Sequence, residues 1–267
     1  MWGKKLKTKE FNFEKMNNPD LSNNKKKDED LFFKEFFGAR KQTILKLKGL
    51  YEEEYFGDKE LQKKREKMYL QEFARLKKYF NINKGGNVLD IGCGTGDFLS
   101  LFGERWNKYG IEISDIAREA ARKKGVIADF ELKDGFFDLI IFRGTIQHIP
   151  DPIYRIGECY YWLKDGGGLV FLSTPNINSI YYKLFNTLPM LNERYNFFLP
   201  SDKTLKQILN NFGFSVKGIE YPYRNTPYAS PIKDVFSFLL KFFKIRKNIK
   251  FPFYKNLMEC YAEKIIK

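Results

Sequence analysis

The sequence predicts an α/β fold in which helices cover both faces of a mainly parallel sheet. Between residues 87 and 175, short segments rich in Val, Ile, Leu and Phe alternate with amphipathic segments of helical spacing. Such alternation is typical of a doubly wound sheet. With 267 residues, of which 43% are hydrophobic, the chain can bury a sizeable core in one domain with additions.

The elements follow one another at regular spacing. The pattern predicts strands at residues 87–91, 108–113, 125–129, 137–142, 168–173, 215–222 and 257–265. It predicts helices at residues 59–80, 96–102, 114–124, 152–164 and 201–214. Ser114 is a suitable N-cap for one helix, and Ser201 or Asp202 for another.

The flanks differ in composition from this central part. Residues 1–84 form a Lys/Asn/Asp-rich tail followed by a helical cap, and residues 85–267 form the main domain. Two aromatic insertions, 176–200 and 223–255, are expected to shape the ligand site. In the helix at 59–80, apolar residues fall on one face: Leu61, Met68, Phe73, Leu76 and Tyr79.

The net charge of +14 is unevenly distributed along the chain. Residues 1–84 carry 22 basic and 14 acidic residues, residues 85–175 carry 10 and 13, and residues 176–267 carry 15 and 6. Basic flanks favour an anionic substrate, a nucleic acid or an anionic membrane. The alternative is surplus lysine that only solvates the surface.

The cysteines and the hydropathy of the chain indicate where in the cell the protein is located. The three cysteines, Cys93, Cys159 and Cys260, are far apart and show neither metal-ligand spacing nor a disulfide framework. No segment approaches the ~18 apolar residues of a membrane-spanning helix. The charged N-terminal segment lacks the apolar run of a signal peptide. The sequence therefore predicts a cytoplasmic protein without a metal.

The segment NVLDIGCGTGDFL, residues 87–99, leads from a strand into a glycine turn. Gly92, Gly94 and Gly96 give G-x-G-x-G, whereas a dinucleotide fingerprint needs its third glycine where Asp97 stands. Asp90, at the end of the strand, would repel a pyrophosphate and attract a cation. The turn therefore favours a ligand with a positively charged amino-acid end and no phosphate.

Two further acidic residues follow at successive strand ends. Glu112 lies 20 residues after Gly92, where a carboxylate can accept hydrogen bonds from both ribose hydroxyls. Asp129 can accept a bond from an adenine amino group, and Phe130 offers a backbone N–H and a ring to the base. Three carboxylates beside a glycine turn suit an adenosyl ligand that carries an ammonium group.

Three motifs, D-I-G-C-G-T-G-D, G-I-E-I-S and FDLIIF followed by TIQHIPDP, resemble those of class I S-adenosylmethionine-dependent methyltransferases. The resemblance covers residues 85–175 and, more loosely, 176–222 and the last strand. It implies a Rossmann-like sheet of seven strands with the last antiparallel, and S-adenosylmethionine as cofactor. It places Asp90 and Gly92, with Gly94 of the same turn, near the methionine part, Glu112 at the ribose and Asp129 at the adenine. A nicotinamide or flavin enzyme, or a turn without ligand, is the alternative.

His148, the one histidine in the chain, follows the fourth predicted strand. An imidazole at that edge can act as a general base or orient an acceptor, although a structural role is the alternative. Arg143 leaves the same strand and can pair with an anionic group of cofactor or substrate, or be an exposed rim charge. Tyr51 and Tyr55 share a helical face. Many members of this family close such a cap over the cofactor, but core packing explains the pair equally well.

The segments after the fifth strand narrow the expected acceptor. STPN, an aromatic insertion and SDKTLKQILNNFGF resemble methyltransferases of bacterial surface-polysaccharide, or capsule, biosynthesis, among them a phosphoramidate O-methyltransferase. We expect in-line methyl transfer to a small anionic or nucleotide-linked acceptor, such as an oxygen of a sugar or capsule precursor.

Two other functions and one other location stay open. The first alternative is an RNA methyltransferase, which is supported mainly by the positive net charge of the chain. No nucleic-acid-binding module is recognisable in the sequence. A non-catalytic protein that binds S-adenosylmethionine is the second alternative. The segment VFSFLLKFFKI, residues 235–245, can form a lid or contact a membrane surface peripherally. The sequence does not define an oligomeric state.

Overall fold

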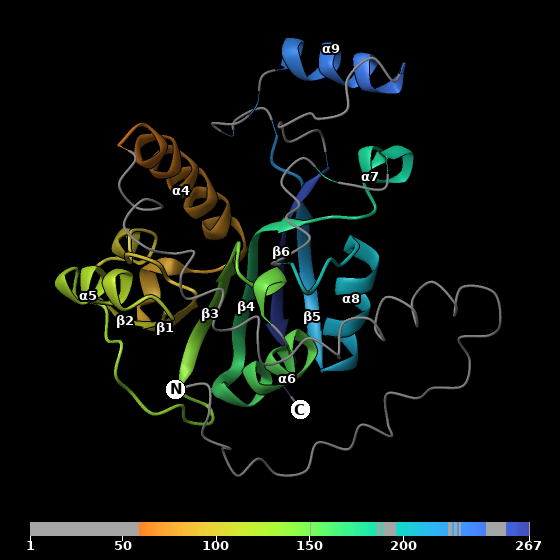
Figure 1. Ribbon diagram of the computed structural model, residues 1–267. Helices are drawn as coiled ribbons and strands as arrows, with labels where there is room; N and C mark the ends of the chain where they lie inside the picture. The colour runs from red at the N-terminus through yellow and green to blue at the C-terminus, as the bar shows by residue number, and fades with distance from the viewer. Residues whose placement is uncertain are drawn as a thin grey trace. The chain divides into compact units, whose positions relative to one another are not determined.

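The computed structural model describes residues 59–149, 151–185, 188, 196–223, 226, 229, 231–243 and 255–266. They belong to one compact unit of the chain, Ala39–Lys267. Within these residues the chain forms a six-stranded sheet. Figure 1 shows its strands in the order β2-β1-β3-β4-β6-β5. The strands are β1 (Gly86–Ile91), β2 (Trp106–Ile111), β3 (Phe137–Arg143), β4 (Leu163–Pro175), β5 (Phe214–Glu220) and β6 (Leu257–Lys264).

The pairing of the strands confirms the predicted α/β class. β1 pairs in parallel with β2 on one side and with β3 on the other, and β3 pairs in parallel with β4. β6 lies between β4 and β5 and is antiparallel to both. The last strand in the chain is therefore antiparallel, as the family resemblance implies, and the crossover from β2 to β3 makes β1 and β3 the switch point of the sheet.

The strand predicted at residues 125–129 is reduced to a single bridge. Ile127 pairs in parallel with Tyr109 of β2, through the hydrogen bonds Gly110 N–H to Ile127 O (3.1 Å) and Ile127 N–H to Lys108 O (2.8 Å). The prediction of a seventh full strand is wrong in this respect. Ile127 lies at the outer edge of the sheet with its side chain exposed, so a longer ladder there would bury little apolar surface.

In the described residues, four of the five predicted helices are present, and two further helices lie in the inserted segments, where none was predicted. The helices are α4 (Lys59–Tyr79), α5 (Asp115–Lys123), α6 (Pro152–Trp162), α7 (Ile180–Phe185), α8 (Asp202–Asn211) and α9 (Pro231–Phe242), with 3₁₀ turns η2 (Ile82–Lys84), η3 (Leu99–Leu101) and η4 (Ile146–His148). The helix predicted at 96–102 is only the short turn η3, because Gly96 has a φ of +77° that no α-helix accepts. Ser114 and Ser201 cap α5 and α8 through the backbone N–H groups of Ala117 and Thr204.

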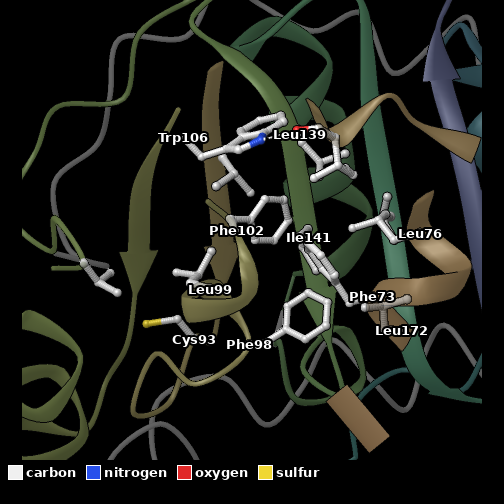
Figure 2. Packing of buried hydrophobic residues seen from close by; sticks show 14 of the residues in the cluster. Phe73, Leu76, Cys93, Phe98, Leu99, Phe102, Trp106, Leu139, Ile141 and Leu172 are labelled. Atoms are coloured by element: carbon white, nitrogen blue, oxygen red, sulfur yellow. Dashed lines mark hydrogen bonds between the residues drawn. The ribbon is translucent and has the colours of Figure 1, made fainter. Parts of the chain in front are cut away.

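Alternate residues of the central strands build one hydrophobic core with α4, η3 and α5. Figure 2 shows Ile141 of β3 next to the rings of Phe98 and Phe102, and Leu172 of β4 beside Phe73. Phe73 and Leu76 of α4 join the same cluster. The residues between them on the strands face the other way and are also fully buried: Leu89, Ile91, Ile140, Phe142, Leu169 and Phe171. Burial on both faces explains the continuous apolar runs of the sequence.

Helix α4 is held to the sheet by polar contacts as well as by its apolar face. Met68, Phe73 and Leu76 are buried, which confirms the predicted face at these positions. Arg75 forms two hydrogen bonds of 2.7 and 2.6 Å to the buried carboxylate of Glu259 in β6. A bidentate charge pair of this kind fixes the orientation of the helix on the strand.

The two predicted insertions each contain a helix. The insertion at 176–200 contains α7, and the one at 223–255 contains α9 (Figure 1). The two helices pack together, because the ring of Phe238 in α9 lies 5.6 Å from the ring of Phe185 in α7. Tyr181 and Leu188 are the buried residues of this small cluster.

Candidate cofactor and acceptor site

The switch point of the sheet brings the glycine turn next to the segment that follows β3. Asp90 of β1 pairs in register with Gly110 of β2 on one side and Ile141 of β3 on the other. A Cβ atom added to Gly92 would collide with the side chain of Thr145. Ligands of open α/β sheets bind outside the carboxyl ends of the strands at this point, and the predicted site residues lie at this edge.

The glycine turn depends on backbone conformations that other residues rarely adopt. Gly92, Gly94 and Gly96 have φ angles of +84°, +54° and +77°. The N–H of Gly92 donates to Ile111 O at 2.7 Å, which joins the start of the turn to the end of β2. The third glycine of a dinucleotide fingerprint is absent, and Asp97 in its place accepts a hydrogen bond from Thr95 Oγ1 at 2.5 Å. A pyrophosphate would meet this carboxylate at the turn.

Glu112 connects the glycine turn to the start of α5. Its Oε2 accepts a hydrogen bond from the backbone N–H of Gly94 at 2.9 Å. Its Oε1 accepts one from the backbone N–H of Ser114, also at 2.9 Å. A carboxylate has about four acceptor positions, so both oxygens can still accept from a ligand's hydroxyl groups. The structure thus places Glu112 beside the turn, as predicted.

Asp90 is a buried carboxyl group at the centre of this edge. It is 1% exposed, and its Oδ1 has no hydrogen-bond partner among the described residues. Burial raises the pKa of Asp90 from its ordinary 3.8 to about 7; Arg143 opposes this rise, whereas Glu112 and Glu72 add to it. A cation beside Oδ1 would restore the ionised form, so the residue is suited to a positively charged ligand group.

The raised pKa of Asp90 gives a testable effect on stability. Because the folded protein holds this proton more tightly than the unfolded chain, the contribution of Asp90 to the free energy of unfolding should fall as the pH rises from about 4 to about 7. Asp90→Asn removes this loss. We expect urea unfolding to show the stability of Asp90→Asn rising relative to wild type over this range. A difference that does not change with pH would contradict the raised pKa.

Arg143 is largely buried, with only 15% of its side chain exposed. Its Nε donates to Glu72 Oε2 of α4 at 2.6 Å, and Ser173 Oγ donates to Glu72 Oε1, also at 2.6 Å. The guanidinium stacks over the ring of Tyr69 with its carbon 4.0 Å from the centroid. The alternative of an exposed rim charge is wrong. A role of Arg143 toward cofactor or substrate stays a prediction, and its buried Nη2 has no partner in the described part of the chain.

The buried role of Glu72 was not predicted from the sequence, although its position on the apolar face of α4 indicated it. Glu72 stands four residues after Met68 and four before Leu76, on the predicted apolar face of α4. An acidic residue on a buried face needs a partner. Ser173, which also escaped notice, has a φ of +50° at the end of β4. This unusual backbone conformation supports the hydroxyl that donates to Glu72.

Asp129 and Phe130 lie farther from this centre. The Asp129 side chain is 76% exposed and accepts a hydrogen bond from Arg122 Nη2 at 2.6 Å. The Phe130 ring packs 5.0 Å from the ring of Tyr109 in β2. The structure therefore brings Asp90 and Glu112 together and leaves Asp129 on the surface beyond the Ile127 bridge. The proposed contacts of both residues with an adenine stay predictions.

His148 lies at the predicted edge of the sheet, in the turn η4 directly after β3. Its backbone N–H donates to Thr145 O at 2.8 Å, and the side chain is partly buried. The neighbouring Gln147 accepts a backbone hydrogen bond from Phe197 N–H at 2.6 Å. This bond holds the segment at 196–200 against η4. The turn that carries His148 therefore lies directly after β3 and contacts an inserted segment, and the role of the imidazole stays a prediction.

Buried polar atoms without partners gather at the same edge. Thr174 and Asn176, at and after the end of β4, and Asn256, just before β6, are fully buried. Thr174 Oγ1, Asn176 Nδ2, both side-chain polar atoms of Asn256 and Gln147 Oε1 have no hydrogen-bond partner among the described residues. Each such atom costs about 1–3 kcal/mol. Bound water or a ligand would satisfy them, so this edge is suited to a polar acceptor.

Tyr51 and Tyr55 lie outside the described residues. Their predicted contact with the substrate stays a prediction.

The fold and the candidate site together indicate the class of protein to which the chain belongs. A doubly wound sheet with an antiparallel last strand carries a glycine turn after β1, carboxylates at the ends of β1 and β2, and a histidine after β3. A family model described as a methyltransferase domain matches residues 61–217, more than half of the chain. The chain belongs to this methyltransferase family.

Curated relatives resemble parts of the chain. It is 26% identical over 167 residues to a malonyl-[acyl-carrier protein] O-methyltransferase of Paenibacillus sp. (strain JDR-2), covering 54% of this chain and 60% of that protein. It is 35% identical over 108 residues to a ubiquinone biosynthesis O-methyltransferase of Pseudomonas aeruginosa (strain UCBPP-PA14), covering 35% of this chain and 46% of that protein. The chain thus spans about half the length of these relatives.

A solved structure supports the fold. A SAM-dependent methyltransferase from Thermotoga maritima, described as a possible histamine N-methyltransferase, superposes with a TM-score of 0.51 at 23% identity. The similarity covers 73% of this chain and 89% of that chain.

Proposed function

We propose that the protein transfers a methyl group from S-adenosylmethionine to an oxygen atom of a small acceptor. The observation that carries this proposal is the pair of carboxylates, Asp90 and Glu112, beside the glycine turn, with Asp90 Oδ1 buried and unpartnered. The family supports methyl transfer, and two relatives named O-methyltransferases favour oxygen as the acceptor atom.

The residues at the turn fit this cofactor. The unpartnered carboxylate of Asp90 suits an ammonium group, and Glu112 retains acceptor positions for ribose hydroxyls. Asp129 and Phe130 would approach the adenine once Asp129 exchanges its surface partner Arg122 for the base. S-adenosylmethionine supplies an electrophilic methyl group on a sulfonium, so the main task of the chain is to align the acceptor in line with it.

His148 would act on the acceptor oxygen. If that oxygen belongs to a hydroxyl group, the imidazole accepts its proton as the bond to the methyl group forms. If the oxygen belongs to a phosphate-type group it is already anionic, and the imidazole donates a hydrogen bond that orients it. The two roles make different predictions for substitutions of His148.

The acceptor we propose is small and phosphorylated or nucleotide-linked, for example a sugar or another capsule precursor such as a phosphoramidate. Residues 176–267, which follow β4 and include both inserted helices α7 and α9, carry 15 basic against 6 acidic residues. Positive charge around a site attracts anionic substrates. Uncharged polar groups, among them Thr174 and Asn176, would bond the hydroxyl groups of such an acceptor.

The cofactor assignment is tested with Glu112→Ala. We expect binding of S-adenosylhomocysteine, measured by isothermal titration calorimetry, to weaken by about 1–3 kcal/mol, because the ribose hydroxyls lose their acceptor. Glu119→Ala, an acidic residue exposed on α5, is the matched control and should bind normally. Glu112→Gln keeps one acceptor oxygen and should fall between the two.

The same substitution also removes the acceptor for the Gly94 N–H, so the folded state needs a separate check. Thermal unfolding without ligand reports any loosening of the turn. An affinity of Glu112→Ala equal to that of wild type would contradict the proposed cofactor site. The acceptor class is tested by transfer of labelled methyl groups to sugar phosphates and nucleotide sugars, with RNA as the competing acceptor. Incorporation into RNA alone would overturn the proposed acceptor.

A further inference from the structure

The inserted helix α9 turns an apolar face to solvent. Its exposed residues, with the turn that follows, are Ile232, Val235, Phe236, Leu239, Phe242 and Phe243. Their positions i, i+3, i+4, i+7, i+10 and i+11 fall on one side of a helix. Exposure reaches 87% for Ile232 and 67% for Phe243. Single exposed apolar residues are common, but such a set on one face marks an interaction surface.

The opposite side of α9 is the side that faces the protein. Asp234 is 2% exposed and accepts a hydrogen bond from Tyr223 Oη at 2.6 Å. Phe238 packs against Tyr181 and Phe185 of α7. These contacts fix the rotation of α9 about its axis. The apolar face, on the opposite side of the helix, therefore points outward.

Basic residues accompany this face. Lys233 is exposed on α9 itself. The segment 241–250, KFFKIRKNIK, carries five Lys or Arg residues and no acidic residue. A stretch of sequence that combines Phe and Leu on one helical face with several Lys and Arg residues is typical of helices that lie in the plane of a membrane surface. Anionic headgroups attract such basic segments.

We propose that α9 binds the surface of an anionic lipid bilayer, with its exposed apolar side chains buried at the headgroup boundary. No helix in the described part of the chain is long and apolar enough to cross a membrane, so the contact is peripheral. β5 runs parallel to β4, and α9 follows β5 in the chain, so the insertion leaves the sheet at the edge that carries the candidate site. The proposal goes beyond methyl transfer and does not depend on it.

The test is co-sedimentation of the full chain with vesicles of phosphatidylcholine containing phosphatidylglycerol. We expect Phe236→Glu with Phe243→Glu to lower the partition coefficient at least about tenfold, since two buried rings are lost. Lys233→Gln should lower it about fivefold, and added salt should weaken binding of wild type. Pure phosphatidylcholine vesicles should bind much more weakly.

Leu70→Glu is the matched control, because Leu70 is a comparably exposed apolar residue on α4. It should bind vesicles like wild type. Circular dichroism would establish that each variant is folded. Equal binding by the double variant and wild type would overturn the proposal. So would a concentration-dependent dimer, abolished by the same double substitution, in a chain that does not bind vesicles, because a second copy would then cover this face.

Discussion

A Glu72→Ala variant is expected to lose about 3–5 kcal/mol of unfolding free energy. Glu72 is 1% exposed and receives hydrogen bonds from Arg143 Nε and Ser173 Oγ, both at 2.6 Å. The substitution leaves the Arg143 guanidinium in the interior without the carboxylate that balances it. Burying an uncompensated charge is among the largest costs a single substitution can cause. Urea unfolding monitored by circular dichroism measures the effect.

Two further variants test whether the loss of unfolding free energy comes from the unpaired buried charge of Arg143. Glu72→Ala combined with Arg143→Met removes both charges and should recover much of the loss, because no buried charge is then left unpaired. Lys217→Ala breaks the partly exposed pair with Glu263 and should cost less than about 1 kcal/mol. A loss of that small size for Glu72→Ala would show that the buried pair does not hold α4 to the sheet.

The Glu72→Ala substitution is expected to affect the candidate cofactor site as well as the stability of the fold. Arg143 acts on two carboxyl groups: it is hydrogen-bonded to Glu72 and lowers the pKa of Asp90 through its charge. Without Glu72, the charge of Arg143 acts on Asp90 alone, a group whose burial disfavours the ionised form that could balance it. The acidic residue of α4 therefore keeps Asp90 available for a cation, and Glu72→Ala should weaken cofactor binding as well as folding.

The central sheet could be predicted because its signal is local. β3 and β4 are buried on both faces and contain continuous apolar runs, and Ser114 caps α5 where the sequence places it. Asp90, Glu112 and His148 could be placed at one edge because parallel strands bring their carboxyl ends together. The strand predicted at residues 125–129 shows where this local signal failed. Asp129 follows an edge segment whose ladder is a single bridge at Ile127, and edge segments carry little periodic signal.

The contacts of Arg143 could not be predicted because they join distant parts of the chain. Glu72 and Arg143 are 71 residues apart, and Ser173 is 101 residues from Glu72. Periodicity assigns a residue to a face of its own element, but it does not say which charged group of another element meets it. The sequence therefore could not show that a basic residue at a strand end pairs with an acidic residue of α4; its predicted role toward cofactor or substrate stays a prediction.

The largest expected effect on activity is that of His148→Ala, which should lower turnover by ~10²-fold or more if the imidazole removes the acceptor proton. η4 holds the residue directly after β3, at the edge that carries Asp90 and Glu112. Binding of S-adenosylhomocysteine should stay unchanged, because the residue acts on the acceptor and not on the cofactor. Steady-state methyl transfer across neutral pH is the measurement.

His148→Gln separates the two roles left open for this side chain. A glutamine amide can donate a hydrogen bond to an acceptor but cannot remove a proton near neutral pH. If His148 is a base, His148→Gln should be as slow as His148→Ala, and both variants should lack the dependence of the rate on a general base. If His148 orients an already anionic oxygen, His148→Gln should recover most of the rate and the acceptor KM. Normal turnover in both variants would show that His148 has no catalytic role. The rate would then come from alignment of the acceptor with the methyl group at this edge of the sheet.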